Sequence, residues 1–392
     1  MRILHITEAF GGGIITVLNS ISRGQAENDA EVDVFYLPRS QAPSEETVRS
    51  QFHPDVHLRR MSVHRRTLVT YMALALTIRR AITSRRYDVI HLHSSKAGVI
   101  GRLAMLTARR TCKVFYSPHG FAFLQLDMNR GVRTVSLMIE RMLARIGDGP
   151  ILTSPSEYSL AQEKLHPPRL FNLRTGIPAS QIRAKTTGSS FAESRPLMVA
   201  MVGRICYQKA PWRFAKVAER LSDQASFFWI GDGPADLAEK WLGGGPVVIT
   251  GWMNPAELET MLDAIDILVF PTLWEGMSLA LMQAQAQGIP AIVSNAVGNV
   301  DSVVHGETGY ICDSDDDFIE KTRLLLSDSG LRERMSSASL DWAMLSLTDE
   351  NVGRDSLRIY GMTVRRAVQE KPFLSSETNV SGGKVASNPT PV

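Results

Sequence analysis

Cysteine is scarce in this 392-residue chain, and long apolar runs are missing. The three cysteines are far apart, odd in number and not in a paired metal-ligand spacing: Cys112, Cys206 and Cys312. This usage excludes a disulfide framework and indicates the reduced thiols of a cytoplasmic protein. No stretch of about 20 apolar residues is available to span a bilayer. The N-terminus, MRILHITEAFGGG, reaches polar residues and glycines too soon for a signal peptide, so we expect a cytoplasmic location.

The dinucleotide-binding fingerprint GxGxxG is also missing. Gly11-Gly12-Gly13 follows the first β-like run, but its spacing differs from the fingerprint, and no acid follows the second strand where one is needed. We therefore do not expect NAD as a cofactor. The three glycines could still let the backbone approach a ligand closely and donate amides to an oxyanion. A plain flexible turn is the alternative.

The composition, 44% hydrophobic and 21% charged, is that of a soluble globular protein. The length fits two domains of about 150 to 200 residues each. A polar stretch at 186–196, TTGSSFAESRP, separates two series in which short β-like runs alternate with helical segments. This alternation predicts parallel sheets covered by helices on both faces. We therefore predict an α/β fold of two doubly wound, Rossmann-like domains, with ligands beyond the carboxyl ends of the strands.

The predicted elements fall on both sides of this stretch. The expected strands are Arg2–Thr7, Glu31–Leu37, Asp88–His93 and Lys113–Ser117 before it, and Leu197–Val202, Ser226–Ile230, Val247–Thr250, Ile265–Phe270, Ala291–Ser294 and Gly309–Cys312 after it. The expected helices include 68–82, 97–107 and a last one at 351–368. Residues 373–392 are mostly small and polar, which predicts a disordered tail.

Charge is unevenly distributed, with 24 Lys and Arg against 14 Asp and Glu up to residue 180, and 19 against 26 beyond it. Arginine doublets surround the amphipathic run 67–82, TLVTYMALALTIRRAI. With Tyr71, Met72, Leu74 and Leu76, this run could lie on an anionic membrane or grip an acidic ligand. The alternative is a helix packed on a sheet with solvated arginines at its ends. No nucleic-acid-binding motif accompanies the charge, so nucleic acid is not an expected partner.

Two cations follow the strand Leu197–Val202, in the phrase VGRICYQKAP. They leave the sheet on one loop at its ligand-binding edge, where Arg204 would supply a planar fork and Lys209 a point charge. Together they could clamp a diphosphate and neutralise the charge that develops on a leaving group. The alternative is that both are simply solvated, as exposed cations usually are.

The phrase WEGMSLALMQAQAQGIP places one carboxylate, Glu275, ahead of a helix predicted to begin near Ser278. Free backbone N–H groups at a helix start favour a phosphate, and an acid before them would meet sugar hydroxyls instead. Gln283 and Gln287 are one helical turn apart, so their amides would line the helix where it nears the ligand. For Gln285 and Gln287 we prefer a plain polar helix face.

A histidine, His119, stands on the loop Pro118-His119-Gly120-Phe121 after the strand Lys113–Ser117. There it could reach into an interdomain cleft and hydrogen-bond a sugar hydroxyl or a developing charge. A purely structural histidine is the alternative. His91 and His93 alternate along the preceding strand, and we expect at least His91 to be packed in the interior.

In this order, the phrases resemble the retaining GT-B glycosyltransferases of family 4, also called glycosyltransferase group 1, of the exopolysaccharide and surface-antigen type. The resemblance covers nearly the whole globular chain. It also includes DVIHLHSSKAG at 88–98, SPSE at 154–157, TGIP at 175–178 in place of the usual NGI, GDGP at 231–234, Gly251-Trp252 and the segment 297–309.

The resemblance implies a GT-B fold with two Rossmann-like domains facing a cleft. Residues 1–185 would bind the acceptor and 195–372 the nucleotide sugar, with the helix at 351–368 packing back toward the N-terminal domain. It further implies sugar transfer from a nucleotide diphosphate donor with retention of configuration, without a metal or another cofactor.

The family's site residues carry over to matching positions of this chain. By resemblance, Arg204 and Lys209 hold the diphosphate, His119 faces the transferred sugar, and Glu275, the first acid of an EX7E motif, contacts that sugar. We expect Glu275 to position hydroxyls and not to act as a covalent nucleophile. The implied catalytic residues are His119, Glu275, Arg204 and Lys209. The implied donor-binding residues are Gly12, Gly13, Arg204, Lys209, Glu275, Gly276, Met277, Ser278, Leu279 and Gln283.

Two places depart from the family pattern. The second acid of EX7E, which contacts the ribose, is Gln283 here; an amide accepts hydrogen bonds without charge assistance, so we expect weaker donor binding and a working enzyme. In the loop 298–302, Asn299 takes the place of a second glycine and Ser302 that of an acid, with Asp301 one residue early. Near the donor, these changes would alter which sugar fits.

The basic N-terminal half suits an anionic or lipid-carried acceptor, such as a glycan on polyprenyl diphosphate. We hypothesise peripheral attachment to the inner face of the cytoplasmic membrane, where an anionic surface would attract it. Two alternatives remain: a nucleotide-sugar epimerase with the GT-B fold, and a catalytically weak binding or scaffold protein with that fold.

Overall fold

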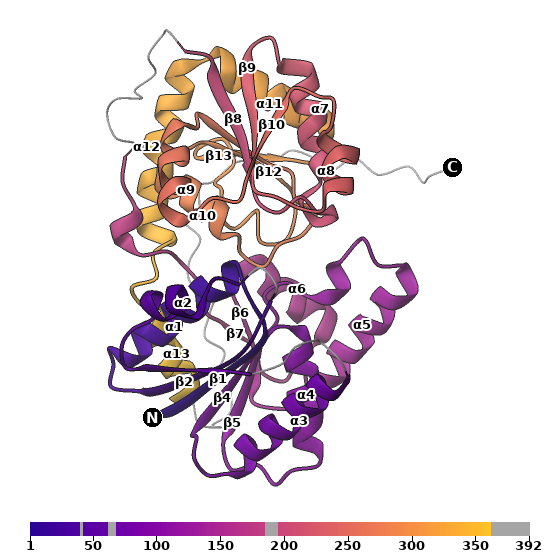
Figure 1. Ribbon diagram of the computed structural model, residues 1–392, viewed down its shortest axis with the longest axis vertical. Coiled ribbons are helices and arrows are strands. Elements are labelled where there is room, and N and C mark those ends of the chain that lie inside the picture. The colour runs from indigo at the N-terminus through magenta and orange to yellow at the C-terminus, as the bar shows by residue number, and fades with distance from the viewer. Residues whose placement is uncertain (40–41, 62–67, 185–194, 362–392) are drawn as a thin grey trace, which may run out of the picture. The chain divides into compact units, whose positions relative to one another are not determined.

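The computed structural model describes residues 1–39, 42–61, 68–184 and 195–361 (Figure 1). Met1–Tyr360 forms one compact unit that contains two parallel sheets, one of seven strands and one of six. The expected tail at 373–392, the end of the expected last helix at 362–368 and most of the polar stretch between the two series lie outside the described residues.

The first sheet has the strand order β3-β2-β1-β4-β5-β6-β7. Its strands are β1 (Arg2–Phe10), β2 (Glu31–Pro38), β3 (Val56–Arg60), β4 (Val89–His93), β5 (Lys113–Ser117), β6 (Gly149–Leu152) and β7 (Phe171–Asn172). The helices of this part are α1 (Gly13–Ala26), α2 (Glu45–Gln51), α3 (Leu68–Thr83), α4 (Ser95–Leu106), α5 (Arg130–Leu143) and α6 (Pro155–Leu165).

The second sheet has the order β10-β9-β8-β11-β12-β13. Its strands are β8 (Leu197–Val202), β9 (Ala225–Ile230), β10 (Val247–Gly251), β11 (Ile267–Phe270), β12 (Ala291–Ser294) and β13 (Gly309–Cys312). The helices that follow are α7 (Pro211–Leu221), α8 (Ala235–Leu242), α9 (Pro255–Ala264), α10 (Leu279–Ala286), α11 (Asp315–Ser327), α12 (Ser329–Ser346) and α13 (Val352–Gly361).

In both sheets the strand order reverses direction at the first strand. β1 lies between β2 and β4, and β8 lies between β9 and β11. Loops that leave neighbouring strands on opposite sides of such a point diverge and create room for a ligand at the carboxyl edge. The loops after β1, β8 and β11 carry the glycine run, the two cations and Glu275, so the topology places all three phrases at such edges.

The predicted fold class is confirmed: both halves are doubly wound α/β sheets. Every expected strand is present, and the boundaries agree to within three residues. Three strands of the first sheet were missed. β3, with the sequence VHLRR, is an edge strand whose last two residues are exposed arginines; β6, GPIL, begins with two residues typical of turns; and β7 has only two residues.

Helix α13 packs on the first sheet although it follows the second in sequence. Val352, Ile359 and Tyr360 lie in the same apolar core as β1, β2 and α1. The contact between α13 and α1 is made by two glycines. A Cβ atom at Gly24 would lie 2.9 Å from the Gly353 Cα, and one at Gly353 would lie 2.1 Å from the Gly24 carbonyl carbon. Only residues without side chains permit this approach.

We expect Gly353→Ala to destabilise the protein by about 1 to 3 kcal/mol, since the added methyl group must displace the α1 backbone. Chemical denaturation of the full chain measures this change. Gly361→Ala, in the same helix, is the matched control because a Cβ there meets nothing within 4 Å among the residues that the structure describes. Equal stabilities of the two variants would contradict the packing of α13 on α1.

Candidate functional site

The loop between β11 and α10 holds Glu275 in an ion pair with Lys209. The Glu275 Oε1 atom lies 2.7 Å from the Lys209 Nζ, and the two side chains are only 11% and 12% exposed. The same Nζ lies 4.8 Å from the centre of the Phe270 ring, at the end of β11. Lys209 can reach this place because Gly203 has no side chain: a Cβ there would lie 3.0 Å from the lysine Cε.

The loop that carries His119 lies against Gly276, directly after Glu275. A Cβ atom at Gly276 would be 2.9 Å from the His119 carbonyl carbon and 3.1 Å from the Gly120 nitrogen. His119 itself has a left-handed backbone, with φ of 53°, and Gly120 follows with φ of 98°. The absence of a side chain at 276 therefore lets the His119 loop lie against the residue that follows Glu275.

Two helix N-termini also approach each other here. α1 begins at Gly13 and α10 at Leu279, and a Cβ on Gly13 would lie 3.4 Å from the Leu279 Cδ1. Neither capping residue, Gly12 nor Ser278, caps its helix with a side-chain hydrogen bond. The N–H groups of both first turns therefore carry partial positive charge that a ligand could meet.

The remaining predicted site residues have varied positions. Arg204 is exposed on the loop that also carries Lys209, and it makes no ion pair with the residues that the structure describes. Gln283 is half-buried on α10, with no side-chain hydrogen bond to the described part of the chain. The helix begins at Leu279 after an N-cap at Ser278, within one residue of the expected start.

The interpretation of Gln285 and Gln287 as a plain polar helix face is wrong. Both side chains are buried, because α10 packs against α12. The Gln285 Nε2 atom donates to the carbonyl oxygens of Ile289, at 3.2 Å, and Thr308, at 3.3 Å. These two glutamines support the interior of the second sheet's domain and do not line a polar surface.

Residues of the SPSE phrase hold the site's loops, a role that the sequence reasoning did not give them. Glu157, fully buried on α6, accepts a hydrogen bond from the Gly120 nitrogen at 2.9 Å. Ser156 donates its hydroxyl and its backbone N–H to Asp301, and its Oγ accepts from the Gly298 nitrogen at 2.8 Å. The available signal was Glu157, which stands three residues after the N-cap residue Ser154, because an acid at that position is typical of a helix start.

The loop at 298–302, which differs from the family pattern, takes part in these contacts. Asp301 is bonded to Ser156, and Asn299 is buried, with its Nδ2 donating to Thr272 Oγ1 and Ser294 Oγ, both at 2.9 Å. Asn299 therefore fixes the ends of β11 and β12. The expectation that these changes select the sugar stays a prediction.

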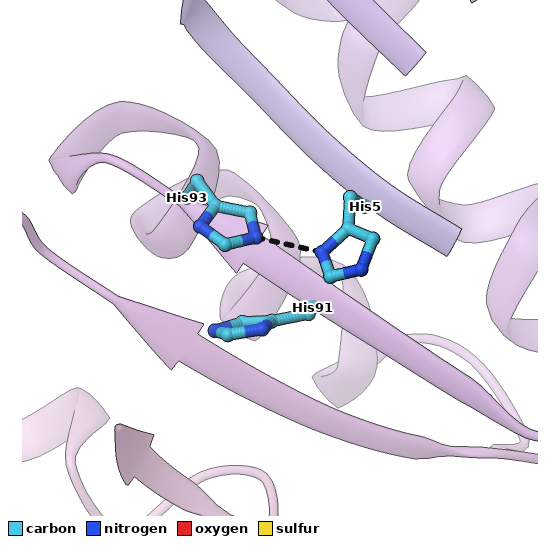
Figure 2. A group of neighbouring side chains, drawn as sticks. All are labelled: His5, His91 and His93. Carbon is cyan, nitrogen blue, oxygen red and sulfur yellow. Dashed lines mark hydrogen bonds between the residues drawn. The ribbon is translucent and has the colours of Figure 1, made fainter. Parts of the chain in front are cut away.

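Three buried histidines and the half-buried His119 form a cluster. The rings of His5, from β1, and of His91 and His93, from β4, gather on one face of the first sheet, and Figure 2 shows the hydrogen bond that joins His5 to His93. His93 Nδ1 lies 2.9 Å from His119 Nε2. Burial lowers the pKa of His5 and of His119 to about 4, and lowers the pKa of His91 and His93 well below the ordinary value. All four rings are therefore neutral at pH 7.

The nitrogens of His5, His91 and His93 lie within 4.8 Å of one another, a spacing that could hold a metal ion. Each ring, however, already uses both nitrogens in hydrogen bonds, to one another, Gln25, Ser117, His119 or Tyr360. A metal ion would have to displace several of these bonds. The prediction that His91 is packed in the interior agrees with its full burial.

A cavity of about 350 Å³ lies at the ends of β1 and β2. Phe10, Tyr36, Arg39 and Arg60 are among its lining residues, whereas His119, Lys209 and Glu275 are not. It therefore does not coincide with the ion pair.

Comparison with known proteins identifies two domain families. Residues 12–170 match the family described as glycosyl transferase 4-like domain, and residues 183–342 match the glycosyl transferases of group 1. An Escherichia coli protein named UDP-Gal:alpha-D-GlcNAc-diphosphoundecaprenol alpha-1,3-galactosyltransferase is 28% identical over 64% of this chain and 68% of its own length. An uncharacterized 41.2 kDa protein in the cps region of Klebsiella pneumoniae is 28% identical over 81% of this chain and 87% of its own.

Solved structures share the fold. Sucrose-phosphate synthase from Thermosynechococcus elongatus superposes with a TM-score of 0.76 at 17% identity, covering 92% of this chain and 98% of that one. HepE from Anabaena, in complex with UDP and glucose, gives 0.73 at 15% identity, covering 93% of this chain and all of the other. At these identities the likeness concerns the fold alone.

The buried histidines predict a steep loss of stability in acid. His5 has a pKa near 4 in the folded protein against 6.5 in the unfolded chain, so it is neutral when folded. Its contribution to the free energy of unfolding is complete above pH 6.5 and is lost as the pH falls toward 4. For His5 alone this loss is on the order of 3 kcal/mol. Glu157 acts in the opposite direction, because burial raises its pKa from 4.5 to about 7, so its contribution falls as the pH rises through that window. Four histidines outweigh one carboxyl group.

Urea unfolding at pH 8, 6.5 and 5 measures this slope. His91→Phe should reduce the pH dependence by up to one proton, whereas His57→Phe, at an exposed position of β3, should leave it unchanged. A flat stability profile between pH 6.5 and 5 in the unmodified protein would contradict the buried neutral cluster.

Proposed function

Because the chain belongs to the glycosyltransferases of group 1 with the GT-B fold, we propose that it transfers a sugar from a nucleotide diphosphate donor, with retention, to a lipid-linked glycan in surface polysaccharide synthesis. The observation that carries this proposal is the ion pair of Lys209 and Glu275 beside the His119 loop. In this pair, Lys209 is a cation that can bind the leaving phosphate, and Glu275 is a carboxylate that can bind sugar hydroxyls.

The donor diphosphate has several positive partners. Lys209 supplies a nearly buried ammonium, Arg204 an exposed guanidinium on the same loop, and the uncapped starts of α1 and α10 supply N–H groups. These groups can stabilise the charge that develops on the departing nucleotide diphosphate as the glycosidic bond breaks. We propose that they make a metal ion unnecessary for this step.

The sugar lies, in this proposal, between Glu275 and His119. Glu275 accepts hydrogen bonds from sugar hydroxyls while Lys209 keeps its carboxylate fixed. A carboxylate already bonded to an ammonium is a weak nucleophile, which favours transfer through an oxocarbenium-like state over a covalent glycosyl-enzyme. Gln283, on α10 after the Glu275 loop, is proposed to meet the ribose hydroxyls.

Relatives support a lipid-linked acceptor. The Escherichia coli relative is named for an acceptor on diphosphoundecaprenol. So is a Campylobacter jejuni relative, 26% identical over 44% of this chain, named N,N'-diacetylbacillosaminyl-diphospho-undecaprenol alpha-1,3-N-acetylgalactosaminyltransferase. Such acceptors are held in a membrane, and none of the described helices is both long and apolar enough to cross one. Surface contact with the membrane is therefore the way we propose that the enzyme reaches them.

Helix α5 provides a surface for this contact. It buries its only acid and exposes its apolar side: Glu140 is 3% exposed and paired at 2.9 Å with Arg102 of α4, whereas Met138 and Met142 are 58% and 70% exposed. The exposed apolar residues of α5 recur at helical spacing on one face: Val132, Val135, Met138, Ile139 and Met142. A helix that buries its only acid and presents an apolar stripe is suited to the interface of a bilayer.

Helices α3 and α4 extend this surface. α4 contacts both α3 and α5, and all three are labelled in the same part of Figure 1. α3 exposes Leu68, Val69, Met72 and Leu76 while its opposite side packs on the sheet, as the packed-helix interpretation of this run expected; its contact with a membrane stays a proposal. No carboxylate other than Glu140 occurs in α3, α4 or α5, and the exposed arginines nearby are Arg79, Arg80, Arg109, Arg130, Arg141 and Arg145. This charge complements anionic lipid head groups.

We expect Lys209→Met and Glu275→Gln each to lower kcat by about 10² to 10³, as the loss of a preorganised charge at a developing charge does. A panel of nucleotide sugars, screened by thermal shift, identifies the donor for this assay. Lys216→Met is the matched control. Lys216 also pairs with a carboxylate, that of Asp315 at 3.3 Å, but it lies on α7 and not in the Lys209 loop. Unchanged turnover in Lys209→Met and Glu275→Gln would overturn the proposed roles.

For the membrane surface, we expect the double variant Met138→Glu, Met142→Glu to lose most of its flotation with anionic vesicles at low salt, because it introduces charge into the apolar stripe. Leu345→Glu, at an 83% exposed position of α12, is the control and should float like the unmodified protein. Flotation that is equal in all three proteins would argue against α5 as the contact.

A further inference from the structure

A chain of hydrogen bonds runs from α13 to His119, and each link in it has one direction. It begins where the Ser356 hydroxyl donates to the Gly353 carbonyl at 2.6 Å. With its hydrogen engaged, the Ser356 Oγ accepts from the Gln25 Nε2 at 2.8 Å. The amide of Gln25 is therefore oriented, and its oxygen faces His5.

The orientation of Gln25 decides the tautomers of the histidines. Gln25 Oε1 can only accept, so His5 Nε2, at 2.8 Å, carries the hydrogen. His5 is buried and neutral, which leaves its Nδ1 without a hydrogen and makes His93 Nε2, at 2.9 Å, the donor to it (Figure 2). By the same step, His93 Nδ1 accepts from His119 Nε2 at 2.9 Å.

A second set of hydrogen bonds, through His91, is consistent with this direction but does not lead to His119. The Ser117 hydroxyl donates to the Ile151 carbonyl at 2.6 Å, so it accepts from His91 Nε2 at 2.8 Å. His91 Nδ1 then accepts from the Tyr360 hydroxyl at 2.7 Å, and that oxygen can accept the second amide hydrogen of Gln25 at 3.4 Å. His91 is as buried as His93 and bonded through both nitrogens, yet it does not touch His119.

We infer that Ser356, Gln25, His5 and His93 are positioning residues that hold His119 as the tautomer with hydrogen on Nε2, so that its Nδ1 is a hydrogen-bond acceptor for the substrate. That a substrate binds to His119 Nδ1 rests on the proposed function. The tautomer itself rests on the hydrogen bonds alone. Within the described residues, the Nδ1 of His119 has no hydrogen-bond partner of its own.

The tautomer restricts what His119 can do. An acceptor nitrogen pairs with a hydroxyl of the transferred sugar and cannot donate to a phosphate oxygen or to the sugar ring oxygen. A donor sugar that lacks the hydroxyl at this position would leave the nitrogen unpaired, so the site would discriminate against deoxy sugars there. Neutrality has a second effect, since an imidazolium beside the sugar would repel the positive charge of an oxocarbenium-like state.

The tautomer can be read directly by NMR of protein labelled with ¹⁵N-histidine, because protonated and unprotonated ring nitrogens resonate far apart. The His119 signals are assigned by their loss in His119→Gln. We expect an unprotonated Nδ1 and a protonated Nε2 in the unmodified protein, with or without substrate. A protonated Nδ1 would overturn the inference.

A matched pair of variants tests the chain of bonds. His93→Phe removes the link to His119, and His91→Phe removes an equally buried ring from the same strand. We expect His93→Phe to give a mixture of His119 tautomers and to lower kcat/KM about tenfold, the size of one hydrogen bond, and His91→Phe to change neither. Thermal denaturation of both separates these effects from a general loss of structure. Identical His119 spectra in the two variants would overturn the inference.

Two milder variants act on the start of this chain of hydrogen bonds: one releases its direction and the other reverses it. Ser356→Ala frees the Gln25 amide to rotate, and Gln25→Glu places a carboxylate beside His5 that favours a doubly protonated ring there. In Gln25→Glu, His5 Nδ1 becomes a donor and the hydrogen of His119 moves to Nδ1. An unchanged His119 tautomer in Gln25→Glu would contradict this relay, the chain of hydrogen bonds from Ser356 through Gln25, His5 and His93 to His119. If the tautomers behave as stated while no nucleotide sugar is turned over, the proposed function fails and this inference stands.

Discussion

The geometry of the site depends on one close approach, that of the Gly276 backbone to the carbonyl carbon of His119. No side chain fits between them, since a Cβ at 276 would be 2.9 Å from that carbon. Glu275 is the residue before this contact and His119 is one side of it, so the backbones of the loop after β11 and the loop after β5 lie against each other. Glu157, by accepting from Gly120, keeps the second loop in the conformation that the contact needs.

Charge near this contact is arranged in compensating pairs. Lys209 and Glu275 are each only about a tenth exposed, and an unpaired charge so placed would be costly. Paired, the two side chains are held in place, and in the proposed function a ligand brings a diphosphate to one and hydroxyls to the other. The histidines solve the same problem differently, because burial keeps them neutral. In the proposed function, with the lysine on the phosphate side and the neutral imidazole on the sugar side, this arrangement suits a reaction in which negative charge leaves and positive charge develops on the sugar ring.

The sequence predicted the architecture because strands covered on both faces read as continuous apolar runs, such as LMVAMV in β8 and ILVF in β11. It did not predict β3, where exposed Arg59 bonds to Asp33 of β2 and makes the strand look like a polar loop. The site phrases were found because each is local. The relay could not be found this way: Gln25 and Ser356 are 331 residues apart, and no periodicity links them. The exposed face of α5 depends equally on a contact, that of Glu140 with Arg102, which no pattern within the helix announces.

A row of histidines cannot choose its own direction. Each neutral ring donates through one nitrogen and accepts through the other, so the row from His5 to His119 would be equally satisfied with every hydrogen moved to the opposite nitrogen. The choice must come from a group whose role is fixed, and the backbone carbonyl of Gly353 is such a group because it can only accept. Gly353 is also the residue that lies against Gly24, where neither helix tolerates a side chain. The packing that seats α13 on α1 therefore also places the acceptor from which the relay takes its direction, and a helix at the end of the described chain fixes which nitrogen of His119 is free to bind.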